Sequence, residues 1–257
     1  MSRVVHEYGF LRKGQLNRRF CVFFVASSPH SWRIGALDLT MVTLRQAFIE
    51  SGFVVVRQAC TPTQVAALRA EVDAARGELE KGGYRIWATA ETLPPSLREW
   101  SETHGLALAR QVLPAEDRGL KCIGGAAILK LPGMHDGTPF HQDDAYGNDG
   151  PHRPGRRACA MWIALSDTDA RSGAMRFAPS LGFELLPHDI VTRESAPSGF
   201  ERFLTPGTPA ERAAERVAES VPMRPGDVLA IGSRVVHGSH AASDAERMAF
   251  SPLYEWD

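Results

Sequence analysis

The chain has 257 residues, of which 44% are apolar and 23% charged, a composition typical of a globular domain and not of a disordered chain. Its 29 basic and 30 acidic residues give a net charge of −1, which provides no general field to attract nucleic acid or anionic lipid. No apolar run approaches the roughly 18 residues that a membrane-spanning helix needs. We therefore expect neither nucleic acid nor a membrane as a partner.

The first 40 residues differ from the rest of the chain in charge, because they hold six basic and two acidic residues. Within them, residues 18–26 read Arg-Arg-Phe-Cys-Val-Phe-Phe-Val-Ala and mimic a secretion signal. The apolar stretch is short and begins late for such a signal. We therefore interpret residues 1–40 as an irregular extension, or as sequence upstream of a true start at Met41, and predict one domain over residues 41–257.

The four cysteines are scattered, and no two of them form a Cys-x-x-Cys pair. This spacing gives no support to structural zinc or to thioredoxin-type redox chemistry. Thiols used in this way are typical of small buried side chains in a reducing compartment. We therefore expect a cytoplasmic protein.

The first part of the predicted domain reads as helices around one strand. Apolar residues recur at helical spacing from Met41, and the β-branched residues 52–57 predict a strand. Residues 61–64, Thr-Pro-Thr-Gln, predict a capping box that opens a helix ending at Gly82. Residues 95–112, bounded by prolines, predict a further helix.

Beyond residue 120 the sequence pattern changes to a succession of short apolar runs. They predict strands over 122–131, 137–143, 157–165, 173–178, 220–223, 226–231, 234–238 and 247–255. Proline, glycine and aspartate separate the runs, which is typical of a sandwich or barrel and not of a βαβ sheet. The polar residues 186–219, with a short helix capped by Thr208, interrupt this core and predict a lid or substrate loop. The sequence thus predicts an all-β core with flanking helices.

The chemically significant residues fall inside this β-core. His141 and Asp143 are two residues apart, so on an extended segment both side chains project to the same face. His237 follows 96 residues later on another predicted strand. Two imidazoles and one carboxylate on one side of a metal leave the opposite positions open, as non-haem iron(II) oxygenases require. Arg247 opens the last predicted strand, where its guanidinium can hold a carboxylate.

Each of these signals is weak when taken alone. Nine histidines and thirty acidic residues produce some His-x-Asp pairs by chance, so the order, the strand context and the trailing arginine favour the metal site together. A third histidine, His240, lies three residues beyond a predicted ligand and faces away on a strand. We interpret His135 and His152 as surface-loop residues, and Trp162 as barrel core with a role in the pocket wall as the alternative.

Four segments also match a known family in the same order. They are Gly52-Phe-Val-Val-Val with Thr61-Pro-Thr-Gln-Val, Lys130-Leu-Pro-Gly with Thr138-Pro-Phe-His-Gln-Asp, Met161-Trp-Ile-Ala-Leu-Ser-Asp, and Arg224-Pro-Gly-Asp-Val-Leu-Ala-Ile with His237-Gly-Ser and Arg247. In these motifs the chain resembles the phytanoyl-CoA dioxygenase family of iron(II)/2-oxoglutarate oxygenases, over roughly residues 41–257. The resemblance implies a double-stranded β-helix, a cupin-like jelly-roll barrel with the metal at its mouth.

The resemblance also implies roles for individual residues. His141, Asp143 and His237 would bind Fe(II), and Arg247 with Ser239 would hold the far carboxylate of 2-oxoglutarate. The implied reaction uses Fe(II), 2-oxoglutarate and O2 to hydroxylate an unactivated C–H bond of a small-molecule substrate, and it releases succinate and CO2. Desaturation, epoxidation and ring formation stay open, whereas the carboxylate of Asp143 argues against a halogenase.

Two further residues are candidate contacts for the cosubstrate. Lys130 is suited to a carboxylate of the substrate or cosubstrate, with an exposed strand residue as the alternative. Phe140 precedes a predicted ligand and is expected either to pack on 2-oxoglutarate or to join the core.

The substrate does not follow from the resemblance. Where the family often has Asn-Gly and then Pro-Gly-Ser-His, this chain has Ser172-Gly173 and residues 178–181, Ala-Pro-Ser-Leu, beside the expected mouth of the site. No basic cluster near the site suggests a clamp for a CoA phosphate, so we expect a free small metabolite. The oligomeric state stays open. The alternatives to an active oxygenase are a barrel that has lost catalysis and a cupin-type metal enzyme that uses no 2-oxoglutarate.

Overall fold

The structure is a computed structural model that describes residues 23–25, 39–82, 85–113, 119–133, 137–148, 157–192 and 200–257. Its main element is a seven-stranded sheet with the strand order β1-β2-β10-β5-β12-β4-β3. These strands are β1 (Phe23–Val25), β2 (Phe53–Arg57), β3 (Arg85–Thr89), β4 (Leu120–Lys130), β5 (Arg157–Ala164), β10 (Val228–Gly232) and β12 (Arg247–Trp256). All pairs are antiparallel except β1 with β2.

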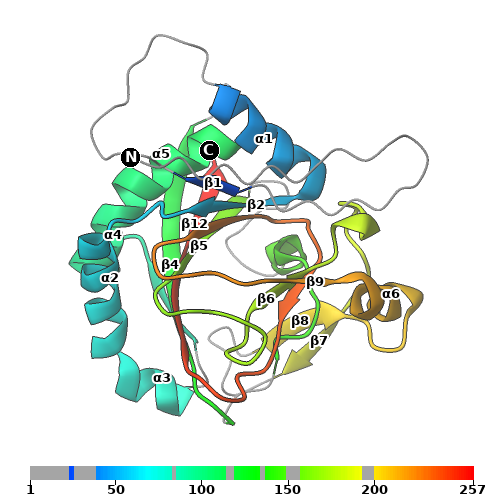
Figure 1. Cartoon of the computed structure of the whole chain (residues 1–257). Helices are drawn as coiled ribbons and strands as arrows, with labels where there is room; N and C mark the ends of the chain where they lie inside the picture. Colours follow the sequence, from blue (N-terminus) through cyan, green and yellow to red (C-terminus); the bar gives the residue numbers. More distant parts are fainter. Residues whose placement is uncertain are drawn as a thin grey trace.

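Two smaller sheets complete the strand-rich core on the opposite side from the main helices (Figure 1). A three-stranded sheet has the order β11-β6-β9, and β7 pairs with β8. The strands are β6 (Met175–Phe177), β7 (His188–Thr192), β8 (Phe200–Leu204), β9 (Glu219–Val221) and β11 (His237–Ser239). Together with the large sheet they form the jelly-roll barrel that the sequence predicts.

Helices cover the outer face of the large sheet, and one helix lies beside the small sheets (Figure 1). The covering helices are α1 (Leu39–Ser51), α2 (Pro62–Ala74), α3 (Arg76–Gly82), α4 (Pro95–Trp100) and α5 (Leu106–Val112), with a π-helical turn, Ser101–Gly105, between the last two. Helix α6 (Pro209–Val217) packs near β8. Short 3-10 helices occupy Asp143–Asn148 and Pro179–Leu181. No described helix is long and apolar enough to cross a membrane.

The strands of the large sheet are apolar on both faces because both faces are buried. Along β2, Val54 and Val56 pack against the helices in an outer core. The alternate residues Phe53 and Val55 pack in an inner core between the sheets. Strands β5, β10 and β12 divide their side chains between the two cores in the same way. The inner face is therefore the one that surrounds the interior of the barrel.

The helix predictions agree with the structure except for one break. Thr61 Oγ1 accepts from the Gln64 backbone N–H at 3.3 Å, and Gln64 Oε1 accepts from the Thr61 N–H at 2.8 Å, which confirms the capping box. The single helix expected to follow is two, α2 and α3, separated at Ala75. The helix capped by Thr208 is α6, and its cap is confirmed by a 3.3 Å hydrogen bond from the N–H of Glu211.

Three parts of the strand prediction differ from the structure. The sequence does not predict strand β3, and residues 137–143 form only an isolated bridge at His141 and not the predicted strand. The lid segment, residues 186–219, contains the strands β7 and β8 as well as the predicted helix. Of the first 40 residues, the structure describes 23–25, which extend the large sheet as β1, and 39–40, which begin α1. A domain boundary at residue 41 stays a prediction.

The π-helical turn before α5 depends on a glycine. Tyr254 of β12 is buried and donates a 2.8 Å hydrogen bond to the carbonyl oxygen of Ser101. A Cβ atom at Gly105 would collide with the Tyr254 hydroxyl and with the ring of Trp100. A side chain at this position would therefore force the helix away from the large sheet.

We predict that Gly105→Ala lowers the free energy of unfolding by roughly 1–3 kcal/mol, because overpacking displaces buried groups. The matched control is Gly77→Ala in α3, where an added Cβ meets no described atom within 4 Å. This control should raise the free energy of unfolding by up to about 1 kcal/mol, since alanine favours helix more than glycine does. Urea unfolding measures both, and a Gly105→Ala protein as stable as the wild type would contradict the prediction.

Candidate metal centre

The two predicted histidine ligands are joined through their backbones. The N–H of His141 donates to the carbonyl of His237 at 2.8 Å, and the N–H of His237 donates to the carbonyl of His141 at 3.0 Å. Residues paired in this antiparallel way project their side chains to the same face. The ring centres of the two imidazoles consequently lie 4.3 Å apart.

Asp143 reaches the same point by a route that differs from the prediction. The chain is not extended as far as this residue, because the 3-10 helix Asp143–Asn148 begins there. The turn brings Asp143 Oδ1 to 3.7 Å from His141 Nε2 and to 3.8 Å from His237 Nε2. The ligand atoms of the three residues all lie within 4.8 Å of one another. The predicted metal-binding triad therefore converges.

Both imidazoles are held in the form that binds metals. His141 Nδ1 lies 2.9 Å from the carbonyl oxygen of Pro139, and His237 Nδ1 lies 3.0 Å from that of Val235. A hydrogen bond from Nδ1 to a carbonyl leaves the lone pair of Nε2 directed at the shared centre. Burial, and then the neighbouring His237, lower the pKa of His141 to about 3. His141 is therefore neutral at physiological pH.

The donor set fits iron(II). Two neutral imidazoles and one carboxylate on one side of a centre are the donors of non-haem iron(II) sites. Metal–ligand bonds of about 2 Å place neighbouring ligand atoms about 3 Å apart. The separations of 3.7 and 3.8 Å from Asp143 Oδ1 thus need small side-chain rotations to close on a metal.

The residues between and after the ligands fix the ligand segment to the rest of the barrel. The buried Gln142 donates its amide N–H groups to the carbonyls of Glu184 (2.8 Å) and Arg234 (2.6 Å), and it accepts from the N–H of Leu186 at 2.8 Å. Asp144 accepts from Nε of Arg234 at 2.8 Å. Both side chains are bonded to distant parts of the chain and not to the metal ligands, a positioning role that the sequence does not predict.

Two buried cations lie deeper in the barrel. Lys130 and Arg247 are opposite each other on β4 and β12, and their exposed fractions are 0% and 2%. Lys130 Nζ donates to Ser239 Oγ at 2.8 Å and to Thr138 Oγ1 at 3.1 Å. The guanidinium of Arg247 lies 5.4 Å from the ring centre of Trp162. Two like charges and two hydroxyls in a buried recess suit a carboxylate, and the alternative of an exposed Lys130 is wrong.

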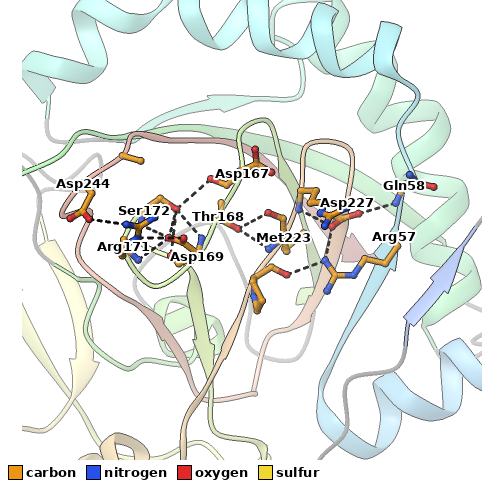
Figure 2. A pocket seen from close by; sticks show the side chains of 13 residues that line it. Arg57, Gln58, Asp167, Thr168, Asp169, Arg171, Ser172, Met223, Asp227 and Asp244 are labelled. Carbon is orange, nitrogen blue, oxygen red and sulfur yellow. Dashed lines mark hydrogen bonds and ion pairs between the residues drawn. The ribbon is translucent and has the colours of Figure 1, made fainter. Parts of the chain in front are cut away.

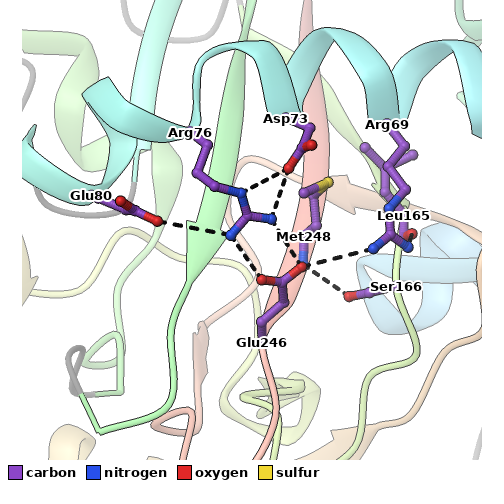
Figure 3. A network of polar contacts seen from close by, with 8 residues as sticks. All are labelled: Arg69, Asp73, Arg76, Glu80, Leu165, Ser166, Glu246 and Met248. Carbon is purple, nitrogen blue, oxygen red and sulfur yellow. Dashed lines mark hydrogen bonds and ion pairs between the residues drawn. The ribbon is translucent and has the colours of Figure 1, made fainter.

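A network of ion pairs anchors the start of β12 from outside (Figure 3). Glu246 accepts two hydrogen bonds from the guanidinium of Arg76, at 3.0 and 3.2 Å, and lies 3.8 Å from Arg69. The hydrogen bonds that Arg76 donates to Glu246, and then to Asp73, raise the pKa of Arg76 above its usual value. Because Glu246 precedes Arg247, the network ties the guanidinium in the barrel to helices α2 and α3.

Phe140 is buried among apolar side chains. Its ring lies in an apolar cluster with Leu204 and Val236, and the guanidinium of Arg176 stands 4.8 Å from the ring centre. The carbonyl of Phe140 accepts from the N–H of Leu204 at 2.8 Å. These contacts are those of a core residue, and contact with 2-oxoglutarate stays a prediction.

The other histidines weighed in the sequence lie apart from the triad or are not described. Nε2 of His240 lies 2.6 Å from Ser220 Oγ, away from the metal ligands as predicted. His135 and His152 lie outside the described residues.

A cavity of about 790 Å³ lies at the ends of β2 and β10 and is not lined by the triad (Figure 2). Its charged side chains largely pair with one another. Arg57 and Asp227 are 2.6 Å apart, and Arg171 lies 3.5 Å from Asp244. This pairing leaves the cavity without a concentrated charge, so we assign it no part in the metal site.

We predict that Asp143→Ala abolishes tight binding of iron(II) while the protein keeps its fold, because a carboxylate is removed from a three-ligand site. Calorimetric titration with iron(II) under anaerobic conditions, or with cobalt(II), measures the affinity, and circular dichroism checks the fold. His240→Ala is the matched control, and its metal affinity should equal that of the wild type. Wild-type affinity in Asp143→Ala would show that the ligand is misassigned.

Comparisons with known proteins identify the family and the fold. The model of the family described as phytanoyl-CoA dioxygenase (PhyH) matches residues 48–249. No curated protein matches the chain. Among solved structures, EvdO2 from Micromonospora carbonacea var. aurantiaca, complexed with 2-oxoglutarate, is 22% identical with a TM-score of 0.65, over 88% of this chain and 93% of that one.

Two further solved structures have the same fold. The epimerase SnoN, in complex with Fe3+, alpha ketoglutarate and nogalamycin RO, is 22% identical with a TM-score of 0.63, over 84% of this chain and 83% of that one. EctD from S. alaskensis, with 2-oxoglutarate and 5-hydroxyectoine, is 16% identical with a TM-score of 0.61, over 88% of this chain and 78% of that one. At these identities the likeness establishes the fold.

Proposed function

The chain belongs to the phytanoyl-CoA dioxygenase (PhyH) family, and we propose that it hydroxylates an unactivated C–H bond of a small-molecule metabolite with iron(II), 2-oxoglutarate and O2. The observation that carries the proposal is the convergence of His141, Asp143 and His237 within 4.8 Å, on the barrel that also buries Lys130 and Arg247. Succinate and CO2 are the expected co-products.

The residues of this chain would hold the cofactors at two places. His141, Asp143 and His237 would bind iron(II), and Arg247, Lys130 and Ser239 would hold the far carboxylate of 2-oxoglutarate. When bound, iron(II) and 2-oxoglutarate supply the activation of dioxygen and the oxidising power for the C–H bond. The buried setting of the two cations strengthens each charge-assisted hydrogen bond to that carboxylate.

The protein's own contribution is to orient the ligands and to exclude water. An apolar wall stands beside the triad, where the ring of Phe177 lies 5.7 Å from that of His237 and 4.2 Å from that of Phe53. Exclusion of water from such a site strengthens its electrostatic interactions and prevents side reactions. The Nδ1 hydrogen bonds of the two histidines keep the imidazoles in one orientation throughout.

We assign substrate selection to the lid segment, because it is bonded directly to the iron-binding segment. His188 Nε2 accepts from the N–H of Gln142 at 3.1 Å. The Tyr146 hydroxyl accepts from the N–H of Arg202 at 2.9 Å. Changes of sequence in β7 and β8 would therefore be transmitted to the mouth of the metal site.

The reaction type and setting are parts of the proposal. SnoN is an epimerase and SnoK, another protein of similar fold, is a carbocyclase, so product analysis must separate hydroxylation from these outcomes. We propose a free metabolite and not a CoA ester as substrate, on the ground that the described residues around the triad hold no basic cluster that would clamp a CoA phosphate. A cytoplasmic location belongs to the same proposal, and so does a catalytic domain that begins at residue 41, after a segment that adds β1 to its large sheet.

The deciding experiment is anaerobic addition of iron(II) and 2-oxoglutarate, followed by oxygen and candidate substrates. We expect a visible absorption band from the iron–2-oxoglutarate chelate, and succinate that increases with substrate. A barrel without catalysis would give neither substrate-dependent succinate nor product. A cupin-type enzyme that uses no 2-oxoglutarate would bind iron and give no chelate band.

We predict that Arg247→Met and Lys130→Met each raise the dissociation constant of 2-oxoglutarate about 10- to 100-fold, since each removes hydrogen bonds between charged groups. Titration of the chelate band under anaerobic conditions measures the constant. Arg224→Met, an exposed residue beside the separate cavity, is the control and should leave the constant unchanged. An unaltered affinity for 2-oxoglutarate in both variants would show that the recess is not the cosubstrate site.

A further inference from the structure

An arginine on the edge strand of the large sheet faces the interior of the barrel. In the pairing of β3 with β4, Arg85 lies opposite Ile128, and Trp87 lies opposite Ala126. Trp87, Ala126 and Ile128 belong to the inner core, whereas Ile86 packs against the outer core. Side chains alternate along a strand, so Arg85 shares the inner face with Trp87.

The inner face of the sheet extends from Arg85 to the recess beside the metal centre. Ile128 is two residues from Lys130 on the same face of β4, so Arg85 stands one step along the sheet from the cosubstrate recess. Burial raises the pKa of Tyr146, whose ring lies 6.3 Å from that of His141, and Arg85 opposes this rise.

Neighbouring cations at the site have described partners of their own. Arg234 bonds to Asp144 at 2.8 Å, and Arg176 lies 3.1 Å from Glu215. Within the described part of the chain, no carboxylate lies within the 4.0 Å of an ion pair from Arg85. The charge of Arg85 is therefore directed at the interior without a described counter-charge.

Two acids nearby do not remove this charge. Asp143 and Glu201 both act on the hydroxyl of Tyr146, as Arg85 does. The carboxylate of Asp143 faces the two histidines and is assigned to the metal. Glu201 is a buried residue of β8, which belongs to the two-stranded sheet and not to the large sheet that contains β3. A negative group that enters between β3 and the triad would thus meet Arg85.

We propose that Arg85 binds a carboxylate of the substrate, and that the substrate is consequently an anionic small metabolite. The inference rests on the proposed oxygenase function and names its substrate class. A guanidinium binds a carboxylate through two parallel hydrogen bonds, so it fixes both the position and the orientation of the bound molecule. Because Arg85 lies on a strand and not on a loop, the sheet holds its guanidinium in a fixed position relative to the metal ligands.

The test compares Arg85→Ala and Arg85→Lys with wild type and with Arg110→Ala, an exposed arginine of α5. The probes are small carboxylic acids and amino acids, each paired with its primary amide. The readouts are the change in the anaerobic iron–2-oxoglutarate band on probe addition, and the rate of succinate formation under oxygen. Calorimetric titration of the same pairs into protein without 2-oxoglutarate gives a readout independent of turnover.

We expect wild type and Arg110→Ala to bind the acid of a responsive pair about 10- to 100-fold more tightly than its amide, as one charge-assisted contact implies. Arg85→Ala should bind acid and amide equally. Arg85→Lys should recover part of the preference for the acid, because lysine keeps the positive charge but cannot make the two parallel hydrogen bonds of a guanidinium. The affinity for 2-oxoglutarate should be the same in all four proteins.

Several results would overturn the inference. They are an acid preference that survives in Arg85→Ala, a wild type that binds amides as tightly as acids, and a wild type that responds to none of the acids. A weaker affinity of Arg85→Ala for 2-oxoglutarate would also overturn it, by placing the guanidinium on the cosubstrate. Failure of the proposed function looks different, since wild type would then give neither chelate band nor succinate while calorimetry still reports on Arg85.

Discussion

The antiparallel pairing of His141 with His237 is the constraint on which the metal centre depends. Two hydrogen bonds, of 2.8 and 3.0 Å, join segments that are 96 residues apart and place both imidazoles on one face. The same pairing attaches the segment that holds His141 to the small sheet and so closes the barrel at this point. Formation of the site is therefore inseparable from a long-range contact, which carries the entropic cost of closing a loop of this length.

Alternate side chains of the central strands of the large sheet face the helices and the interior of the barrel. On β12, Met248 and Phe250 hold the helices, whereas Arg247 and Ala249 face the interior. The ion pairs of Glu246 hold the start of β12 on the helices. They thereby fix the position of the Arg247 guanidinium inside the barrel. In this way the helical layer, which is distant from the metal ligands in sequence, determines the geometry of the recess.

Local signals made much of this predictable, and tertiary contacts explain the rest. The capping box at Thr61 is encoded within four residues, and the triad follows from residue types and their order. The turn at Asp143 could not be foreseen, because it depends on bonds from Gln142 and Asp144 to distant parts of the chain. Strand β3 was missed since its five residues mix charged, aromatic and small side chains, and only its pairing with β4 makes it a strand.

The buried amide of Gln142 has a thermodynamic consequence. One side chain bonds the backbone at Glu184 and Leu186, just before β7, and also the carbonyl of Arg234, three residues before His237. Movement of the segment before β7 therefore disturbs bonds that hold two metal ligands in place. Linkage between two such sites is reciprocal. Whatever free energy an ordered lid adds to the binding of iron, iron adds to the ordering of the lid.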